Sequence, residues 1–252
     1  MHFELFLIIM AALAIAVFIC LFFVEAGYGK FYDRKWGPAI GNRLGWVLME
    51  APVFITMLVL CIVSDRKTDI VRLIFLLIFE IHYFQRTFIF PFLIRGDGRM
   101  PLAIIFTGMV FNTANAFMQG GWIFHVSPAE MYGIEWLKDP RFILGTVLFF
   151  TGMYINIHSD SIIRHLREPG DNKHYLPTGG MFDYVTSANY FGELMEWVAF
   201  AILTWSLSGA VFALWTFANL APRALCIHRR YAVEFEGQWD PSKVKCLIPF
   251  IW

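Results

Sequence analysis

The sequence begins with the stretch HFELFLIIMAALAIAVFICLFFV (His2–Val24), which contains one acidic residue, Glu4, and no Lys or Arg. About 20 consecutive apolar residues are enough for a helix to cross the hydrocarbon core of a bilayer. No basic segment precedes this stretch and no clear small-residue cleavage site follows it, so we interpret it as a retained membrane helix and not as a signal peptide. It places the chain among the membrane proteins.

The composition of the whole chain supports this class. Of its 252 residues, 58% are hydrophobic and only 16% are charged, whereas soluble domains carry about 25% charged residues. The net charge is zero, which gives a nucleic-acid partner no electrostatic footprint. We expect neither a disulfide framework nor a metal centre, because the four cysteines show no paired spacing. They are Cys20, Cys61, Cys226 and Cys246.

Apolar segments predict an all-α fold with seven membrane helices. They lie at Phe3–Val24, Trp46–Val63, Val71–Leu93, Leu102–Val126, Phe142–His158, Leu194–Leu207 and Gly209–Ala221. The last two are short and are joined by the sequence SLSG, so six spans are the alternative if they form one kinked element. No linker or repeat divides the chain, and we therefore expect a single domain over residues 1–252.

The distribution of Lys and Arg predicts the orientation in the membrane. Most of these residues fall in the first, third and fifth connections and in the C-terminal tail. Because cytoplasmic loops are enriched in Lys and Arg, the N-terminus is expected outside and the C-terminus in the cytoplasm. The membrane would be the endoplasmic reticulum in a eukaryote and the inner membrane in a bacterium.

Polar residues interrupt the predicted spans. A charged side chain at the middle of a membrane helix costs about 2.5–3.5 kcal/mol, so each one needs a partner or a wet cavity. Those in the second, third and fourth spans are Glu50, Glu80, His82, Tyr83, Gln85, Arg86, Asn112, Asn115 and Gln119.

Two further segments carry polar stripes. In INIHSDSIIRHLREPG (Ile155–Gly170), the residues Asn156, Asp160, Arg164 and Arg167 fall within about 80° of a helix circumference. In the sixth span, a second stripe of Asn189, Glu193 and Glu196 covers about 60°.

The stripes have two interpretations. They form structural ion pairs between helices, or they line a site for a ligand with phosphates, an amide and riboses. Arg donates to phosphate in a fork, and carboxylates accept from ribose hydroxyls. Neither GxGxxG nor GxxxxGK[ST] is present, so a soluble nucleotide-binding fold is not indicated.

Longer motifs resemble the steroid 5α-reductase family, and the resemblance runs nearly from end to end. It implies an NADPH-dependent reductase of the Δ4 double bond of 3-oxo-Δ4 steroids, held in a seven-helix membrane fold. The motifs are GYGK (Gly27–Lys30), HYFQRT (His82–Thr87), GMYINIHSD (Gly152–Asp160), LREPG (Leu166–Gly170), PTGGMFDYVTSANYFGELMEWVAFAILTWS (Pro177–Ser206) and LIPFIW (Leu247–Trp252).

The same resemblance implies roles for individual residues. Glu50 and Tyr83 align with the catalytic pair. The family pattern has Gln at the position of Met49 and an Arg near Val244, for which Lys243 or Lys245 is the candidate replacement. Cofactor-binding residues are expected at Asn156, Asp160, Arg167, Asn189, Glu193, Tyr231, Arg95 and Arg99, and substrate-binding residues at Glu50, Tyr83, Trp46, Tyr28 and Trp197.

The implied chemistry suits a Tyr–Glu pair. Hydride addition to an enone builds negative charge on the carbonyl oxygen, and losing one hydrogen-bond donor to that charge costs about 2.7–4 kcal/mol. Tyr83 is expected to donate to this oxygen. Glu50 either donates to it in protonated form or, when ionised, orients Tyr83 or a water.

Other functions stay open on the sequence alone. A related reductase could act on an enoyl thioester or a polyprenol, and membrane methyltransferases that use S-adenosylmethionine also end in a basic, aromatic tail. A transporter or receptor could use the stripes as a permeation path. As alternatives to the catalytic roles, Tyr83 is an aromatic residue at the membrane interface and Glu50 is a structural partner of Arg86. The expected partners are the steroid and the bilayer, with no obligate protein partner and no nucleic acid.

Overall fold

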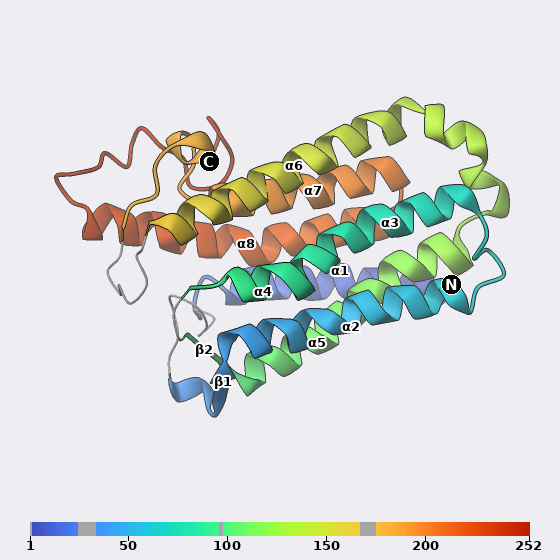
Figure 1. The fold of residues 1–252 in the computed structure, drawn as a ribbon, viewed down its shortest axis with the longest axis horizontal. Coiled ribbons are helices and arrows are strands. Elements are labelled where there is room, and N and C mark those ends of the chain that lie inside the picture. The colour runs from blue at the N-terminus through green and yellow to red at the C-terminus, as the bar shows by residue number, and fades with distance from the viewer. Residues whose placement is uncertain (1, 25–33, 96–97, 167–174) are drawn as a thin grey trace.

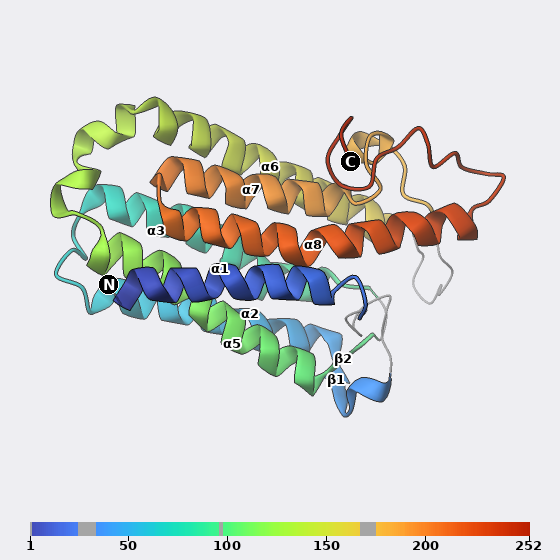
Figure 2. The same cartoon turned by 180° about the vertical axis from the view of Figure 1, so that it is seen from behind.

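The structure is a computed structural model that describes residues 2–24, 34–95, 98–166 and 175–252. Long helices lie side by side and form an elongated bundle, as the two opposite views show (Figures 1 and 2). The all-α prediction with seven long helices is confirmed. These helices are α1 (His2–Cys20), α2 (Asn42–Ile62), α3 (Ile70–Phe84), α5 (Leu102–Gly121), α6 (Pro140–His165), α7 (Ala188–Thr204) and α8 (Leu207–Glu234).

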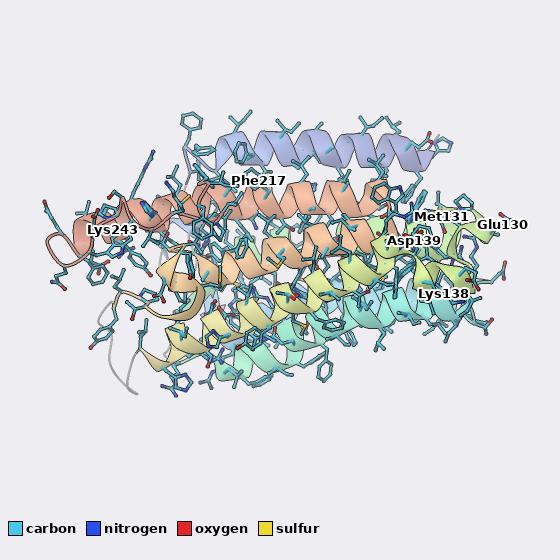
Figure 3. All side chains as sticks on the ribbon, turned by 90° about the horizontal axis from the view of Figure 1, so that it is seen from above. Glu130, Met131, Lys138, Asp139, Phe217 and Lys243 are labelled. Carbon is cyan, nitrogen blue, oxygen red and sulfur yellow. The ribbon has the colours of Figure 1, made fainter. Side chains whose placement is uncertain are left out.

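Within the described residues, six helical segments are long and apolar enough to cross a membrane. They are His2–Cys20, Asn42–Ile62, Ile70–Leu93, Leu102–Val126, Pro140–His165 and Leu207–Glu234. Helix α7 has 17 residues and is shorter than these, so its crossing stays a prediction, as does the orientation. Charged side chains mark both ends of the bundle, with Glu130, Lys138 and Asp139 at one end and Lys243 at the other (Figure 3).

Three helices extend six residues or more beyond the ranges expected from the sequence. Helix α6 begins at Pro140 and ends at His165, whereas the apolar segment covers only Phe142–His158. Helix α7 begins six residues before Leu194, and α8 continues past Ala221 to Glu234. The added turns contain polar residues such as Asp160, Asn189 and Arg230, so the apolar pattern ends where the hydrogen bonding of the helix backbone continues.

Helices α7 and α8 are separate and do not form one kinked element. Between them Trp205 adopts a left-handed conformation with φ of 45°. The next residue, Ser206, caps α8, because its hydroxyl accepts a hydrogen bond from the backbone N–H of Gly209 at 3.0 Å. The chain therefore reverses direction within two residues.

Helix α3 does not end at Phe84 but passes through a π-helical turn, Gln85–Ile89, into the short helix α4 (Phe90–Leu93). The backbone N–H of Phe90 donates to the carbonyl of Gln85, five residues earlier. The next residue, Pro91, has no N–H to donate, so an ordinary helical bond is lost at this point. Single π turns of this kind occur frequently at functional sites.

One pair of short strands lies at the end of the bundle where α2 begins. Strand β1 (Ala39–Gly41) pairs antiparallel with strand β2 (Arg99–Pro101). The backbone N–H of Asn42 also donates to the carbonyl of Gly98 at 2.9 Å. This pairing ties the start of α2 to the start of α5 (Figure 1).

At the opposite end, two large buried polar side chains, Arg72 and Tyr132, are hydrogen-bonded within the protein. The Arg72 side chain is 1% exposed, pairs with Asp69 and donates to the Ile123 carbonyl at 2.9 Å. The Tyr132 hydroxyl donates to the Thr204 carbonyl at 2.6 Å, and burial raises the pKa of Tyr132 to about 12. These contacts join the ends of α3, α5 and α7.

Helices α6 and α7 pack through glycines. A Cβ on Gly192 would lie 2.5 Å from the backbone N of Asn156, and a Cβ on Gly152 would lie 2.7 Å from the Gly192 carbonyl oxygen. Small residues at such interfaces allow two helix backbones to approach closely. The close approach brings the polar stripes of α6 and α7 together.

Candidate active site

Side chains of α5 form hydrogen bonds with Glu50 and Tyr83, the two residues that the sequence indicates as catalytic. The Asn112 side chain donates to the Glu50 carboxyl at 3.1 Å and to the Met49 carbonyl at 2.7 Å. One turn along, the Asn115 side chain donates to the Tyr83 hydroxyl at 2.9 Å. Because Asn112 and Asn115 are three residues apart, they lie on one face of α5 and bring Glu50 of α2 alongside Tyr83 of α3.

Aromatic rings fix the orientation of Tyr83. Its ring centroid lies 4.7 Å from that of Phe79 and 5.5 Å from that of Trp197, which is 1% exposed. The His82 ring packs against Tyr83 at 5.1 Å and places Nδ1 2.7 Å from a carboxyl oxygen of Glu196. Tyr83 is thus held by its ring on one side and by its hydroxyl on the other.

An ion-pair cluster surrounds Arg86, which lies in the π-helical turn three residues after Tyr83. The Arg86 guanidinium is 3.6 Å from the Asp160 carboxyl and 3.4 Å from the Glu193 carboxyl. The guanidinium also lies over the ring of Trp46, 5.1 Å from its centroid. Glu50 is hydrogen-bonded to Asn112 instead, so the reading of Glu50 as the structural ion-pair partner of Arg86 is not supported in the described part of the chain.

The stripes of α6 and α7 contact each other directly. The Asn189 side chain donates to the Asp160 carboxyl at 3.0 Å, and the Asn156 side chain donates to the Asn189 carbonyl at 2.9 Å. The structural interpretation of the stripes expects such pairs. Not every group is used, however: the buried atoms Ser159 Oγ, Arg164 Nη1 and Ser187 Oγ have no hydrogen-bond partner within the residues described.

Some of the other expected site residues lie outside this cluster. Arg95 and Arg99 are exposed near the strand pair, and Arg99 is part of β2. Tyr231 is 3% exposed on α8 and packs against Phe235, with ring centroids 5.7 Å apart. Tyr28 and Arg167 are outside the described residues.

The sequence predicts polar residues inside the spans, but it does not predict the contacts that hold Glu50, Tyr83 and Arg86 in place. Asn112, Asn115 and Arg86 were recognised only as polar residues inside apolar segments, and their partners are 62, 32 and 107 positions away in the chain. The contact between His82 and Glu196, 114 positions apart, is likewise not predicted by the sequence. The only available signal was the cost of a polar group in a membrane, which implies a partner but does not name it.

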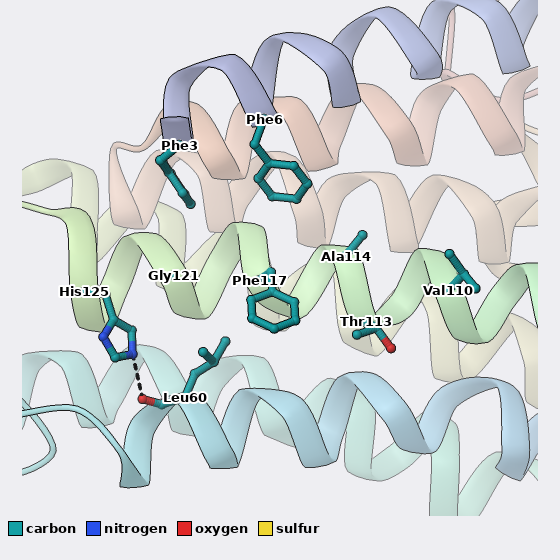
Figure 4. A pocket seen from close by; sticks show the side chains of 9 residues that line it. All are labelled: Phe3, Phe6, Leu60, Val110, Thr113, Ala114, Phe117, Gly121 and His125. Carbon is teal, nitrogen blue, oxygen red and sulfur yellow. Dashed lines mark hydrogen bonds between the residues drawn. The ribbon is translucent and has the colours of Figure 1, made fainter. Parts of the chain in front are cut away.

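A separate apolar groove lies on another face of α5. It has a volume of about 630 Å³ and lies between α1, α2 and α5 (Figure 4). The only side-chain hydrogen bond drawn there joins His125 Nε2 to the Leu60 carbonyl at 3.0 Å. Glu50 and Tyr83 do not line it. Its residues are Phe3, Phe6, Leu60, Val110, Thr113, Ala114, Phe117, Gly121 and His125.

Comparison with known proteins relates the chain to one family. The sequence pattern of the family described as 3-oxo-5-alpha-steroid 4-dehydrogenase matches residues 98–252. The chain is 39% identical over 259 residues to 3-oxo-5-alpha-steroid 4-dehydrogenase 1 of Homo sapiens, covering 99% of this chain and 96% of that protein. It is 37% identical over 244 residues to the Bos taurus protein of the same name, with 95% and 93% covered. It is 35% identical over 240 residues to steroid 5-alpha-reductase DET2 of Arabidopsis thaliana, with 93% and 90% covered.

Proposed function

This chain belongs to the 3-oxo-5-alpha-steroid 4-dehydrogenase family and is a multi-pass membrane enzyme, and from this premise we propose that it uses NADPH to reduce the Δ4 double bond of 3-oxo-Δ4 steroids. Substrates of the testosterone or progesterone class would become 5α-dihydro steroids, with a hydride added at C5 and a proton at C4. We also propose that residues 1–252 form one domain in which α7 completes seven crossings, with the N-terminus outside and the C-terminus in the cytoplasm.

The observation that carries this proposal is the joint positioning of Glu50 and Tyr83 by α5. The Asn115 amide occupies a lone pair of the Tyr83 hydroxyl, which leaves the hydroxyl proton free to point at a substrate oxygen. Negative charge develops on the steroid ketone oxygen as the double bond is reduced, and a fixed donor is strongest in such a buried site. Glu50, anchored by Asn112, completes the grip on the ketone.

The cluster beside Arg86 has the donors and acceptors that a dinucleotide requires. NADPH bound there would supply the hydride. Asn156, Asp160, Asn189 and Glu193 offer amide and carboxyl groups to riboses and the nicotinamide amide. The fit is supported by the buried polar atoms without partners on the same helix stretch, among them Arg164 Nη1, which suits a phosphate oxygen.

The test is turnover by the purified protein. We expect incubation with NADPH and progesterone to yield a product two hydrogens heavier by mass spectrometry. Tyr83→Phe should lower kcat by about 10²–10³-fold, because it removes the donor to the ketone, and should leave NADPH binding intact. The matched control is Tyr154→Phe, since Tyr154 is 67% exposed on α6.

The alternatives give different results in the same assay. Reduction of a long-chain enoyl thioester or a polyprenal, but not of progesterone, would indicate a related reductase. Binding of S-adenosylmethionine in preference to NADPH would indicate a methyltransferase. A Tyr83→Phe variant with unchanged kcat would refute the assigned role of Tyr83.

A further inference from the structure

One buried carboxyl group, that of Glu80, has no role in the reaction proposed above. Glu80 lies in the second half of α3 and is 8% exposed, and neither of its carboxyl oxygens has a hydrogen-bond partner among the described residues. The other buried acids of the described chain are all engaged: Glu50 with Asn112, Asp160 with Asn189 and Glu196 with His82. Glu80 is therefore the exception among four.

An unpaired acid in a membrane helix is not explained by stability. A buried polar group without a hydrogen bond is destabilising, and an apolar residue of the same size would avoid that cost. Ionisable residues retained inside spans usually serve a ligand or a reaction. Glu80 thus calls for a partner of its own.

The position of Glu80 relative to Tyr83 indicates where that partner lies. The two residues are three positions apart on α3, so their side chains are neighbours on one side of the helix. Thr87 lies in the π-helical turn, four positions beyond Tyr83; it is 0% exposed, and its hydroxyl also has no partner within the described part of the chain. Along the third span, Tyr83 therefore has on either side a buried polar group that no described residue satisfies.

Glu80 and Thr87 lie in opposite directions from Tyr83 along the third span. Thr87 lies on the same side of Tyr83 as Arg86, whose guanidinium meets the Asp160 and Glu193 carboxyls of the proposed cofactor cluster. Glu80 lies on the other side, about 4.5 Å further from that cluster along the helix axis. A molecule that reaches both Tyr83 and Glu80 is the substrate and not the cofactor.

We propose that Glu80 is a substrate-binding residue that selects 3-oxo-Δ4 steroids bearing a hydroxyl group away from the reacting enone. A carboxyl group can bond a hydroxyl in either protonation state, because its oxygens accept in both forms and its proton, when present, donates. The inference rests on the proposed function and adds a preference within the substrate class. A site built to bond a hydroxyl discriminates strongly against the analogue that lacks it, since its own polar group is then left unpaired.

The experiment compares kcat/KM for progesterone and for androst-4-en-3-one with derivatives that carry one hydroxyl, at position 11, 17, 19 or 21. With the wild-type enzyme, at least one hydroxylated steroid should be favoured over its parent by about tenfold or more. Glu80→Leu should bring that ratio close to one, and Glu80→Gln, which still donates and accepts, should retain most of it. Thr87→Val is the matched control, since it removes an unpartnered buried group on the cofactor side and should not alter the ratio.

Three results are decisive. Equal kcat/KM for parent and hydroxylated steroids with the wild-type enzyme overturns the inference, as does a ratio that Glu80→Leu leaves unchanged. Absence of turnover with every steroid overturns the proposed function instead. Thermal unfolding supplies a second readout: Glu80→Leu should melt at or above the wild-type temperature, whereas a purely structural role for Glu80 requires a lower melting temperature.

Discussion

Adding one methyl group at Gly192 should push α6 and α7 apart. The new Cβ would lie 2.5 Å from the backbone N of Asn156, whereas ordinary contact begins at 3.4 Å. The helices would have to separate by about 0.9 Å, a misplacement of the size that costs about 10²-fold in rate when it reaches a catalytic site. The 2.9 Å bond from Asn156 and the 3.0 Å bond from Asn189 to Asp160 would then lengthen to about 3.8–3.9 Å and be lost.

The expected cost follows from these contacts. Overpacking destabilises by about 1–3 kcal/mol, and loss of a hydrogen bond to a carboxylate adds about 1.5–3 kcal/mol. Gly192→Ala should therefore lower the melting temperature and weaken NADPH binding by about tenfold or more, as measured by thermal unfolding and by titration in detergent.

The matched control is Gly133→Ala. Gly133 has a φ of −67° and nothing within 4 Å of an added Cβ, so this change should leave both quantities unaltered. Wild-type melting and wild-type NADPH affinity in Gly192→Ala would refute the view that glycine contacts set the register of the two stripes.

Three further expectations concern single side chains. Asn115→Leu removes the donor to Tyr83 and should lower kcat by about tenfold with no change in NADPH affinity, and an unchanged kcat would count against it. The Arg141 side chain and backbone hold the pKa of Asp139 at about 2, so the stabilisation of the α6 N-terminus is present above pH 4 and is lost as the pH falls towards 2. The difference in melting temperature between wild type and Asp139→Asn should accordingly shrink over that interval, and a difference independent of pH would contradict this. Burial raises the pKa of Cys246 to about 11, so iodoacetamide at pH 8 should label it only after denaturation in detergent, as read by mass spectrometry; rapid labelling of the folded protein would disprove its burial.

Hydropathy located the helices well and their ends poorly. The cores of α2, α3 and α5 coincide with apolar segments, because burial in lipid requires both an apolar surface and a fully hydrogen-bonded backbone. The first turn of α7 contains Asn189 and the last turns of α8 contain Arg229 and Arg230, so the apolar pattern fades there while the helix continues.

In the candidate site, the sequence predicts which residues share a helix face but not which residues of different helices are in contact. Helical periodicity correctly placed Asn156 with Asp160, and Asn189 with Glu193, because these relations are local. The contact of Arg86 with both acids, and the support of Glu50 and Tyr83 by α5, depend on how the helices are set against one another. That setting arises from close backbone approaches such as the one at Gly192, which a single sequence does not reveal.

The π-helical turn at Gln85–Ile89 accommodates an extra residue in the third span. It holds one residue more than the α-helical turn it replaces. Deleting a single amino acid there would restore regular hydrogen bonding and would still leave a continuous helix. The segment beyond the deletion would keep nearly the same rotation about the helix axis, because the extra residue is accommodated within a single turn. The side chains of the turn itself would move instead, which would take the Arg86 guanidinium away from its place over the Phe90 ring. A one-residue deletion at this turn would thus leave the helices on either side in register and would displace the residues between them, so we expect it to disrupt the Arg86 ion pairs without unfolding the span.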